Sequence, residues 1–150
     1  MGDAQILICY DGSDEARHAI DVAAELLGPR RAVVLDVGPV LTTAESLATL
    51  SSVVPGTAFE DLNADGALER ARDGAERASR AGFAAHARGE TAAGAWEGIV
   101  DVADEIDAAA IVIGSRGLNG PRELFEGSVS HEVAAHAGRP VLIVPPPGDS

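Results

Sequence analysis

Short apolar runs alternate with helix-patterned stretches along most of this chain, and this alternation restricts the fold more than any other feature of the sequence. The runs are brief and bounded by turn signals, which predicts strands at residues 5–10, 32–37, 83–88, 108–113 and 140–144, the third being the weakest. Helical spacing predicts helices at residues 14–27, 63–82, 96–106 and 127–137. Strands that alternate with helices and read as continuous apolar runs predict an α/β fold: a doubly wound parallel sheet with helices on both faces. The length of 150 residues fits one domain spanning residues 1–150.

The sequence GSRGLNGPRELFEGS connects the fourth predicted strand to the fourth predicted helix. Gly114 and Gly117 can expose backbone amides in a turn, and Gly127 with Ser128 opens a helix whose free N–H groups carry the equivalent of about half a positive charge. Ligands of parallel α/β sheets bind beyond the carboxyl ends of the strands, where the winding reverses. Any one of these glycines could simply close a connection, but the full spacing G-x2-G-x9-G-S predicts an anion site built from backbone amides and from the hydroxyls of Ser128 and Ser130.

The composition narrows how this chain can hold a phosphate and where it works. Its formal net charge is −13 and all 11 basic residues are arginine, so the lysine of a P-loop is missing and binding to nucleic acid is disfavoured. No apolar run approaches the ~20 residues that cross a bilayer, and the N-terminus lacks the features of a signal peptide. We therefore expect a cytoplasmic protein that binds neither membrane nor nucleic acid.

The stretches ILICYDGSDEARHAI, VVLDV, IVIGSRG and GSVSHEVAAHAGRPVLIVP resemble the universal stress protein family over residues 5–144. The glycine spacing is similar to that of its ATP-binding branch, and the resemblance implies a five-stranded sheet in the order 3-2-1-4-5. It further implies that Asp11 meets the nucleotide near adenine and ribose, and that Val37 and Ile113 line the adenine pocket, with the backbone of Val37 reading the base. The phosphates of ATP, bound with Mg²⁺, would lie against Gly114, Gly117, Gly127, Ser128, Val129 and Ser130.

One departure from the family pattern bears on affinity. Many relatives carry a basic residue just after the second glycine, where this chain has Leu118. Arg116 and Arg122 can supply positive charge nearby, whereas Glu123 and Glu126 in the same loop weaken it. We therefore expect nucleotide binding that is weaker than in close relatives. A cAMP-binding member of the family, with the adenine pocket kept and the phosphate contacts reduced, stays an alternative.

The resemblance implies a nucleotide-dependent regulatory protein of the stress response. Slow ATP hydrolysis or autophosphorylation is left open, because the sequence shows no general base with a supporting group. A nucleotide-free interaction protein is a further alternative. The least favoured is an ATP pyrophosphatase-type adenylating enzyme, because YDGSDE supplies only part of an S-G-G-x-D-S loop. The same stretch is no G-x-G-x-x-G, which disfavours a Rossmann dehydrogenase.

Two segments raise questions that the pattern leaves open. From Gly38 to Leu62 the period dissolves over more than the ~12–15 residues usual for a connection; a lid over the nucleotide and a variable loop are equal alternatives. The last predicted strand, from Pro140 to Val144, would be an apolar sheet edge, and the resemblance implies a homodimer through it. The tail, residues 145–150, is expected to be disordered.

Several single residues are expected to be structural. Cys9 lies in an apolar run and predicts a buried thiol. Trp96, at helical spacing, is expected to anchor a core or an interface, and His131 is expected to be a surface or packing residue rather than a catalytic one. The charges of the second helix are expected to form a solvated face; they are Glu69, Arg70, Arg72, Asp73, Glu76 and Arg77.

Overall fold

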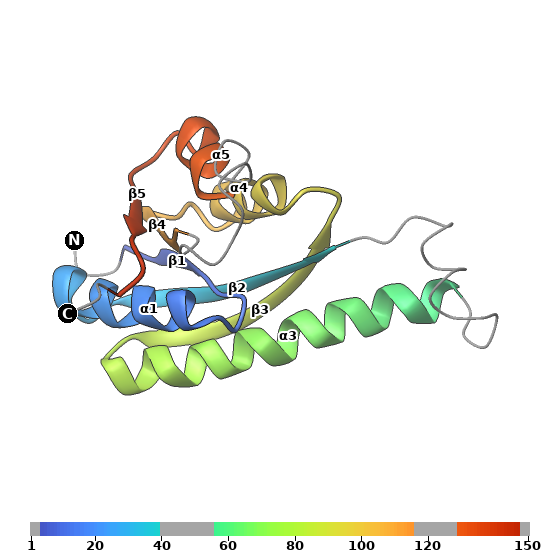
Figure 1. Ribbon diagram of the computed structural model, residues 1–150, viewed down its shortest axis with the longest axis horizontal. Coiled ribbons are helices and arrows are strands. Elements are labelled where there is room, and N and C mark those ends of the chain that lie inside the picture. The colour runs from blue at the N-terminus through green and yellow to red at the C-terminus, as the bar shows by residue number, and fades with distance from the viewer. Residues whose placement is uncertain (1–3, 40–55, 116–128, 148–150) are drawn as a thin grey trace.

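The computed structural model describes residues 4–39, 56–115 and 129–147. These residues form a five-stranded sheet in the order β3-β2-β1-β4-β5, with every neighbouring pair parallel (Figure 1). The strands are β1 (Ile6–Cys9), β2 (Arg31–Pro39), β3 (Ala84–Ala92), β4 (Ala110–Gly114) and β5 (Val141–Val144). The predicted α/β class and strand order are confirmed.

Helices cover both faces of the sheet. They are α1 (Asp14–Leu27), α3 (Gly56–Ala81), α4 (Ala95–Glu105) and α5 (Val129–His136). On β1, Ile6 and Ile8 pack into the core beneath α1 and α3, whereas Leu7 and Cys9 pack into the core beneath α4 and α5. Because successive strand side chains point to opposite faces, a central strand covered on both faces must be apolar throughout. This is why β1 reads as an unbroken apolar run.

The turn after β1 sets the start of α1. The Ser13 hydroxyl accepts a hydrogen bond from the backbone N–H of Ala16 at 3.1 Å, which is the expected N-cap. The helix ends at Gly28, which has a φ of +72° and donates its N–H to the carbonyl of Ala24. Both predicted boundaries of this helix are confirmed, and its N-terminus lies at the carboxyl end of β1.

Two predicted boundaries are wrong. The helix expected from residue 63 begins at Gly56, so the last part of the irregular segment expected from Gly38 to Leu62 is helical; its first two residues belong to β2, and residues 40–55 lie outside the described residues. The strand expected to end at Arg88 runs to Ala92, because backbone pairing with β2 continues to Pro39 although the side chains become polar. An edge strand tolerates polar side chains that a central strand excludes.

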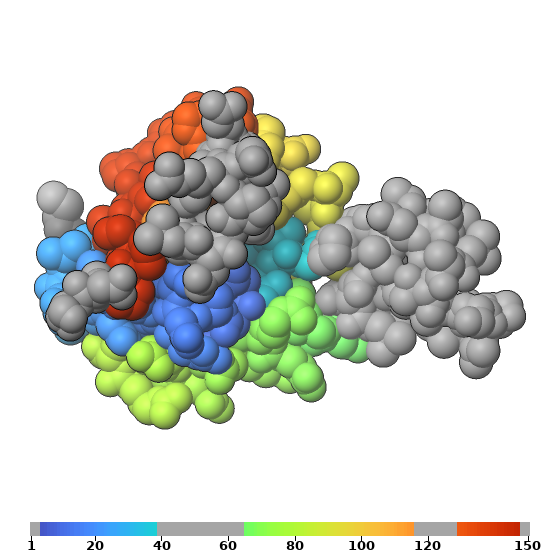
Figure 2. All heavy atoms as spheres, viewed as in Figure 1, coloured from blue at the N-terminus to red at the C-terminus, as the bar shows by residue number. Residues whose placement is uncertain are grey.

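The expected solvated face of α3 is also partly wrong, because three of its charges make contacts across the fold. Arg70 pairs with β2, Asp73 contacts β1 and α1, and Arg77 pairs with α1. The intervening residues of α3 that face the sheet are small, so the helix lies close enough for flanking charges to reach across. In the space-filling view the side chains of α3 (green) lie directly against those of α1 (blue) (Figure 2).

Candidate functional site

A cavity of about 430 Å³ opens at the carboxyl ends of β1, β2 and β4. From β1 the chain winds outward to β2 and β3, and it then returns to β4 and β5 on the other side. The cavity therefore lies at the reversal of winding where open α/β sheets bind their ligands. The first turn of α1 and residues of α4 and α5 complete its wall.

All the predicted site residues that the structure describes line this one cavity. They are Asp11, Val37, Ile113, Gly114, Val129 and Ser130. The other four, Arg116, Gly117, Gly127 and Ser128, lie outside the described residues. The fold thus brings together positions that are up to 119 residues apart in the chain (130 − 11), and their role in binding stays a prediction.

One side of the cavity is apolar. Val37 and Ile113 end two of the strands, and Ala95 and Ile99 of α4 face them. Gly98 permits this packing, because a Cβ there would lie 3.0 Å from a methyl carbon of Val37. The sequence placed Ile99 on the apolar stripe of a helix, but nothing in its spacing indicated that this stripe ends at the cavity.

Asp11 combines a structural contact with access to the cavity. One of its carboxylate oxygens accepts the backbone N–H of Ser13 at 2.9 Å, and the turn between them passes through Gly12 at a φ of +83°. This is ordinary Asp-Gly-Ser turn chemistry. The carboxylate is exposed and lines the cavity, so it can accept hydrogen bonds from amino or hydroxyl groups of a ligand.

Gly114 is explained by packing as well as by its place in the motif. A Cβ on Gly114 would lie 3.1 Å from the carbonyl oxygen of Glu15, in the first turn of α1. The bare backbone therefore lets the end of β4 approach the N-terminus of α1. Glu15 and Ala16 also line the cavity, so this close approach shapes the wall between two loops that were both predicted to bind the ligand.

Asp36 is a cavity residue that the sequence reasoning missed. It is 3% exposed and accepts hydrogen bonds from Arg70 of α3, at 2.8 Å from Nε and 3.3 Å from Nη2. Burial raises the pKa of the Asp36 carboxyl, and the Arg70 guanidinium opposes that shift. An aspartate inside the apolar stretch VVLDV was the available signal, because buried carboxylates need a partner.

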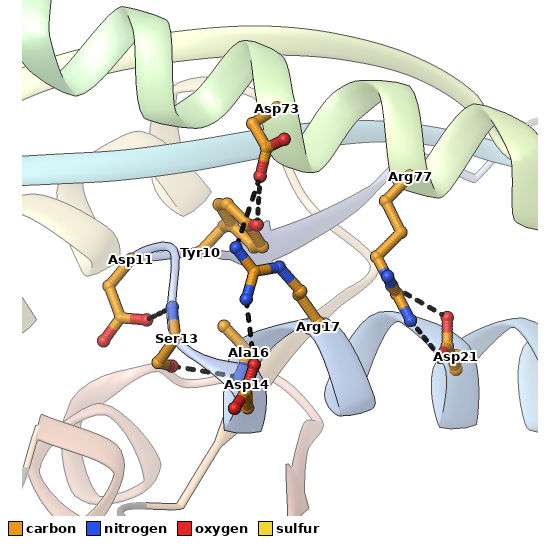
Figure 3. A network of polar contacts seen from close by, with 9 residues as sticks. All are labelled: Tyr10, Asp11, Ser13, Asp14, Ala16, Arg17, Asp21, Asp73 and Arg77. Atoms are coloured by element: carbon orange, nitrogen blue, oxygen red, sulfur yellow. Dashed lines mark hydrogen bonds and ion pairs between the residues drawn. The ribbon is translucent and has the colours of Figure 1, made fainter.

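A second polar contact joins α3 to the cavity wall. The buried Tyr10 donates its hydroxyl to Asp73, which also lies 4.0 Å from Arg17 of α1 (Figure 3). Burial raises the pKa of Tyr10, and the hydrogen bond to Asp73 raises it further. Burial also raises the pKa of the Cys9 thiol to about 12, which agrees with the expected buried, unreactive thiol.

The remaining candidates lie beside the cavity. Trp96 packs against the core shared by α4 and α5 and stacks on His136, with ring centroids 4.4 Å apart, which fits the expected anchor. In the described part of the chain, no cluster of three or more His, Cys, Asp or Glu side chains could hold a metal ion. None of the described helices is long and apolar enough to cross a membrane.

A parallel α/β sheet with a ligand-sized cavity at the reversal of its winding defines the class of this protein. The chain belongs to the universal stress protein family, whose sequence profile matches residues 4–145. A curated relative, universal stress protein YxiE of Bacillus subtilis (strain 168), is 32% identical over 148 residues, covering 93% of this chain and 97% of the relative.

Solved structures share the fold. A universal stress protein in complex with cAMP has a TM-score of 0.69 and 22% identity, covering 98% of this chain and all of that one. A universal stress protein from Archaeoglobus fulgidus in complex with dAMP has a TM-score of 0.57 and 21% identity, covering 96% of this chain and 99% of that one. These identities support the shared fold alone.

Proposed function

We propose that this protein is a cytoplasmic, nucleotide-dependent regulator of the stress response that binds ATP, with Mg²⁺, in the cavity at the ends of β1, β2 and β4. The observation that carries the proposal is the convergence on one cavity of every described residue assigned to the nucleotide. Its volume of about 430 Å³ falls within the range of roughly 300–1,000 Å³ typical of ligand pockets. Two proteins of the same fold were solved with the adenine nucleotides cAMP and dAMP.

In this proposal the two sides of the cavity hold different parts of the nucleotide. The adenine ring packs between Val37 and Ile113, and Asp11 accepts hydrogen bonds from the nucleoside. The phosphates lie beyond Gly114, toward Val129 and Ser130. There they also meet Arg116, Gly117, Gly127 and Ser128 of the G-x2-G-x9-G-S motif. Backbone amides and helix N-termini can bind phosphate without a lysine.

Calorimetric titration with MgATP tests the proposal. Wild type should bind, and Gly117→Val, which alters the phosphate side only, should bind at least about tenfold more weakly, since tenfold corresponds to about 1.4 kcal/mol and one hydrogen bond contributes about that much. Leu26→Gln, at a 65% exposed position of α1, is the matched control and should bind like wild type. Equal affinity of Gly117→Val and wild type would remove the motif from the explanation.

A cAMP-binding function is the second candidate, favoured by the cAMP complex of a similar fold and by Leu118 in place of a basic residue. Competition between the two nucleotides separates the candidates. If ATP is the ligand, Gly117→Val should weaken ATP far more than cAMP, because ATP has more phosphates to hold. If cAMP displaces ATP from wild type at much lower concentration, the second candidate replaces the first.

The proposal treats ATP as a ligand that shifts conformations rather than as a substrate. It also includes a homodimer through β5. Within the described residues β5 pairs only with β4, and Ile143 is exposed on it. Two such apolar edges can pair about a two-fold axis, which covers both.

A further inference from the structure

A second hollow, of about 890 Å³, lies between α3 and β3 and shares no lining residue with the nucleotide cavity. One wall consists of six residues of α3 between Leu68 and Arg80, and the other of three consecutive residues of β3, from Ala85 to Ala87. We call this hollow the α3–β3 groove. Its binding role is independent of the nucleotide proposal.

The strand wall of the groove is the free edge of the sheet. Successive side chains of a strand point to opposite faces, so three consecutive residues can line one hollow only if the backbone edge forms the wall. In the described part of the chain, β3 pairs only with β2, over all nine of its residues. Its other edge therefore offers backbone N–H and C=O groups to an incoming strand.

The helix wall carries arginines without acidic partners. Elsewhere in the described residues five arginines pair with carboxylates; they are Arg17, Arg70, Arg77, Arg88 and Arg139. Arg72 makes no such pair with a described residue, and the guanidinium of Arg80 contacts the backbone carbonyl of Glu76 at 3.4 Å. In a chain of net charge −13, the groove is thus a local positive surface.

The spacing of these charges matches an extended peptide. Arg72 and Arg80 are eight residues apart on α3, which corresponds to about 12 Å along the helix axis. Residues i and i+4 of a strand point the same way and are about 13 Å apart. Glu76 lies midway between the arginines, opposite position i+2 of such a strand.

We propose that the α3–β3 groove binds an extended segment of another protein, which adds to the edge of β3 as a strand. Its two carboxylates, four residues apart, pair with Arg72 and Arg80, and a basic side chain between them meets Glu76. A second copy of this chain fits less well. Its own β3 would present Ala85 and Ala87, which belong to the face of the core beneath α3 and carry no charge.

Fluorescence anisotropy with a labelled peptide, Thr-Glu-Val-Lys-Val-Glu-Thr, tests the pairing. Wild type should bind it, and should bind the peptide with both Glu replaced by Gln at least about tenfold more weakly, because charge-assisted hydrogen bonds are about twice as strong as neutral ones. The variant with Arg72→Gln and Arg80→Gln should lose at least about tenfold in affinity for the Glu peptide. Equal binding of the two peptides by wild type would overturn the proposal.

The matched control is Arg77→Gln, which removes the same charge from the same helix but at the contact with Asp21 of α1. It should bind the Glu peptide like wild type. If it loses as much affinity as Arg72→Gln alone, long-range charge rather than the groove holds the peptide. Circular dichroism melts of all variants establish that each is folded.

Hydrogen exchange tests strand addition. The peptide should slow exchange at the β3 amides that point away from β2 and leave those that bond to β2 unchanged. Binding without this protection would reduce the site to an ion-pairing surface and overturn the strand model. Self-association of wild type that the double variant abolishes would assign the groove to a second copy instead.

Discussion

Gly74 and Gly66 both lie inside α3, but their surroundings differ sharply. A Cβ on Gly74 would lie 2.7 Å from Cγ of the buried Tyr10 ring and 2.8 Å from a methyl carbon of Val34. The nearest atom to a Cβ on Gly66 is the tip of the Arg70 side chain at 3.6 Å, an ordinary contact. Substituting alanine at both positions therefore separates helix propensity from packing against the cavity wall.

Alanine is favoured over glycine in a helix interior by about 1 kcal/mol. Gly66→Ala has no clash, so we expect it to stabilise the protein by about 0.5–1 kcal/mol. Gly74→Ala gains the same propensity term but overpacks a buried ring, which typically costs about 1–3 kcal/mol. The propensity term cancels between the two variants, so Gly74→Ala should be less stable than Gly66→Ala by about 1–3 kcal/mol.

Thermal and urea unfolding of the two variants measure this difference. At about 2–4 °C per kcal/mol for a chain of this size, the melting temperatures should differ by about 2–12 °C. Tyr10 is the single tyrosine of the chain, so its near-ultraviolet circular dichroism should change in Gly74→Ala and not in Gly66→Ala. Equal stability of the two variants would refute the close packing of α3 on Tyr10 and with it this wall of the cavity.

Three further outcomes follow from the geometry. Burial raises the pKa of Asp36 above its ordinary 3.8, so the protonated acid is the form favoured by folding: wild type should gain urea stability relative to Asp36→Asn as the pH falls toward 3.8, and this gain should be lost as the pH rises through the raised pKa; a pH-independent difference would contradict it. With its thiol buried at a pKa of about 12, Cys9 should react with a thiol reagent at neutral pH only in denaturant, and rapid labelling of the native protein would contradict the buried site. Ile143→Glu should convert a dimer to a monomer in sedimentation velocity, whereas Leu26→Glu, at another exposed apolar position, should not; a monomeric wild type would remove the β5 dimer.

The strands of this fold could be predicted because burial on both faces leaves an unmistakable pattern. The four residues of β1 are all buried, and such a strand can hold only apolar side chains. Edge position weakens this signal. β3 contains Arg88 and Glu90, which pair with one another, and its last residues are held by backbone bonds that leave no trace in the side-chain pattern. The same reasoning explains why the start of α3 was missed.

The position of the candidate site could be predicted because it depends on topology and on short motifs. Asp11 and Gly114 follow strands that become neighbours in any sheet of this order, and loops at one sheet edge lie close together. The wall formed by α4 could not, because it depends on how closely a helix packs. Gly98 permits that approach, but in the sequence it is one of 17 glycines.

The same limit applies to charge, and it changes how the acidic composition should be understood. A net charge of −13 counts every carboxylate alike, whereas the structure divides those near the cavity by their partners. Asp36 is bound to Arg70, and Asp73 to Tyr10 and Arg17; Asp11 already accepts one backbone N–H. Paired carboxylates project little field, and exposed charges farther away are screened within about 10 Å at ordinary salt. An anion that enters this cavity therefore meets a local environment set by helix ends and bare amides, and the overall charge is a poor guide to whether it binds.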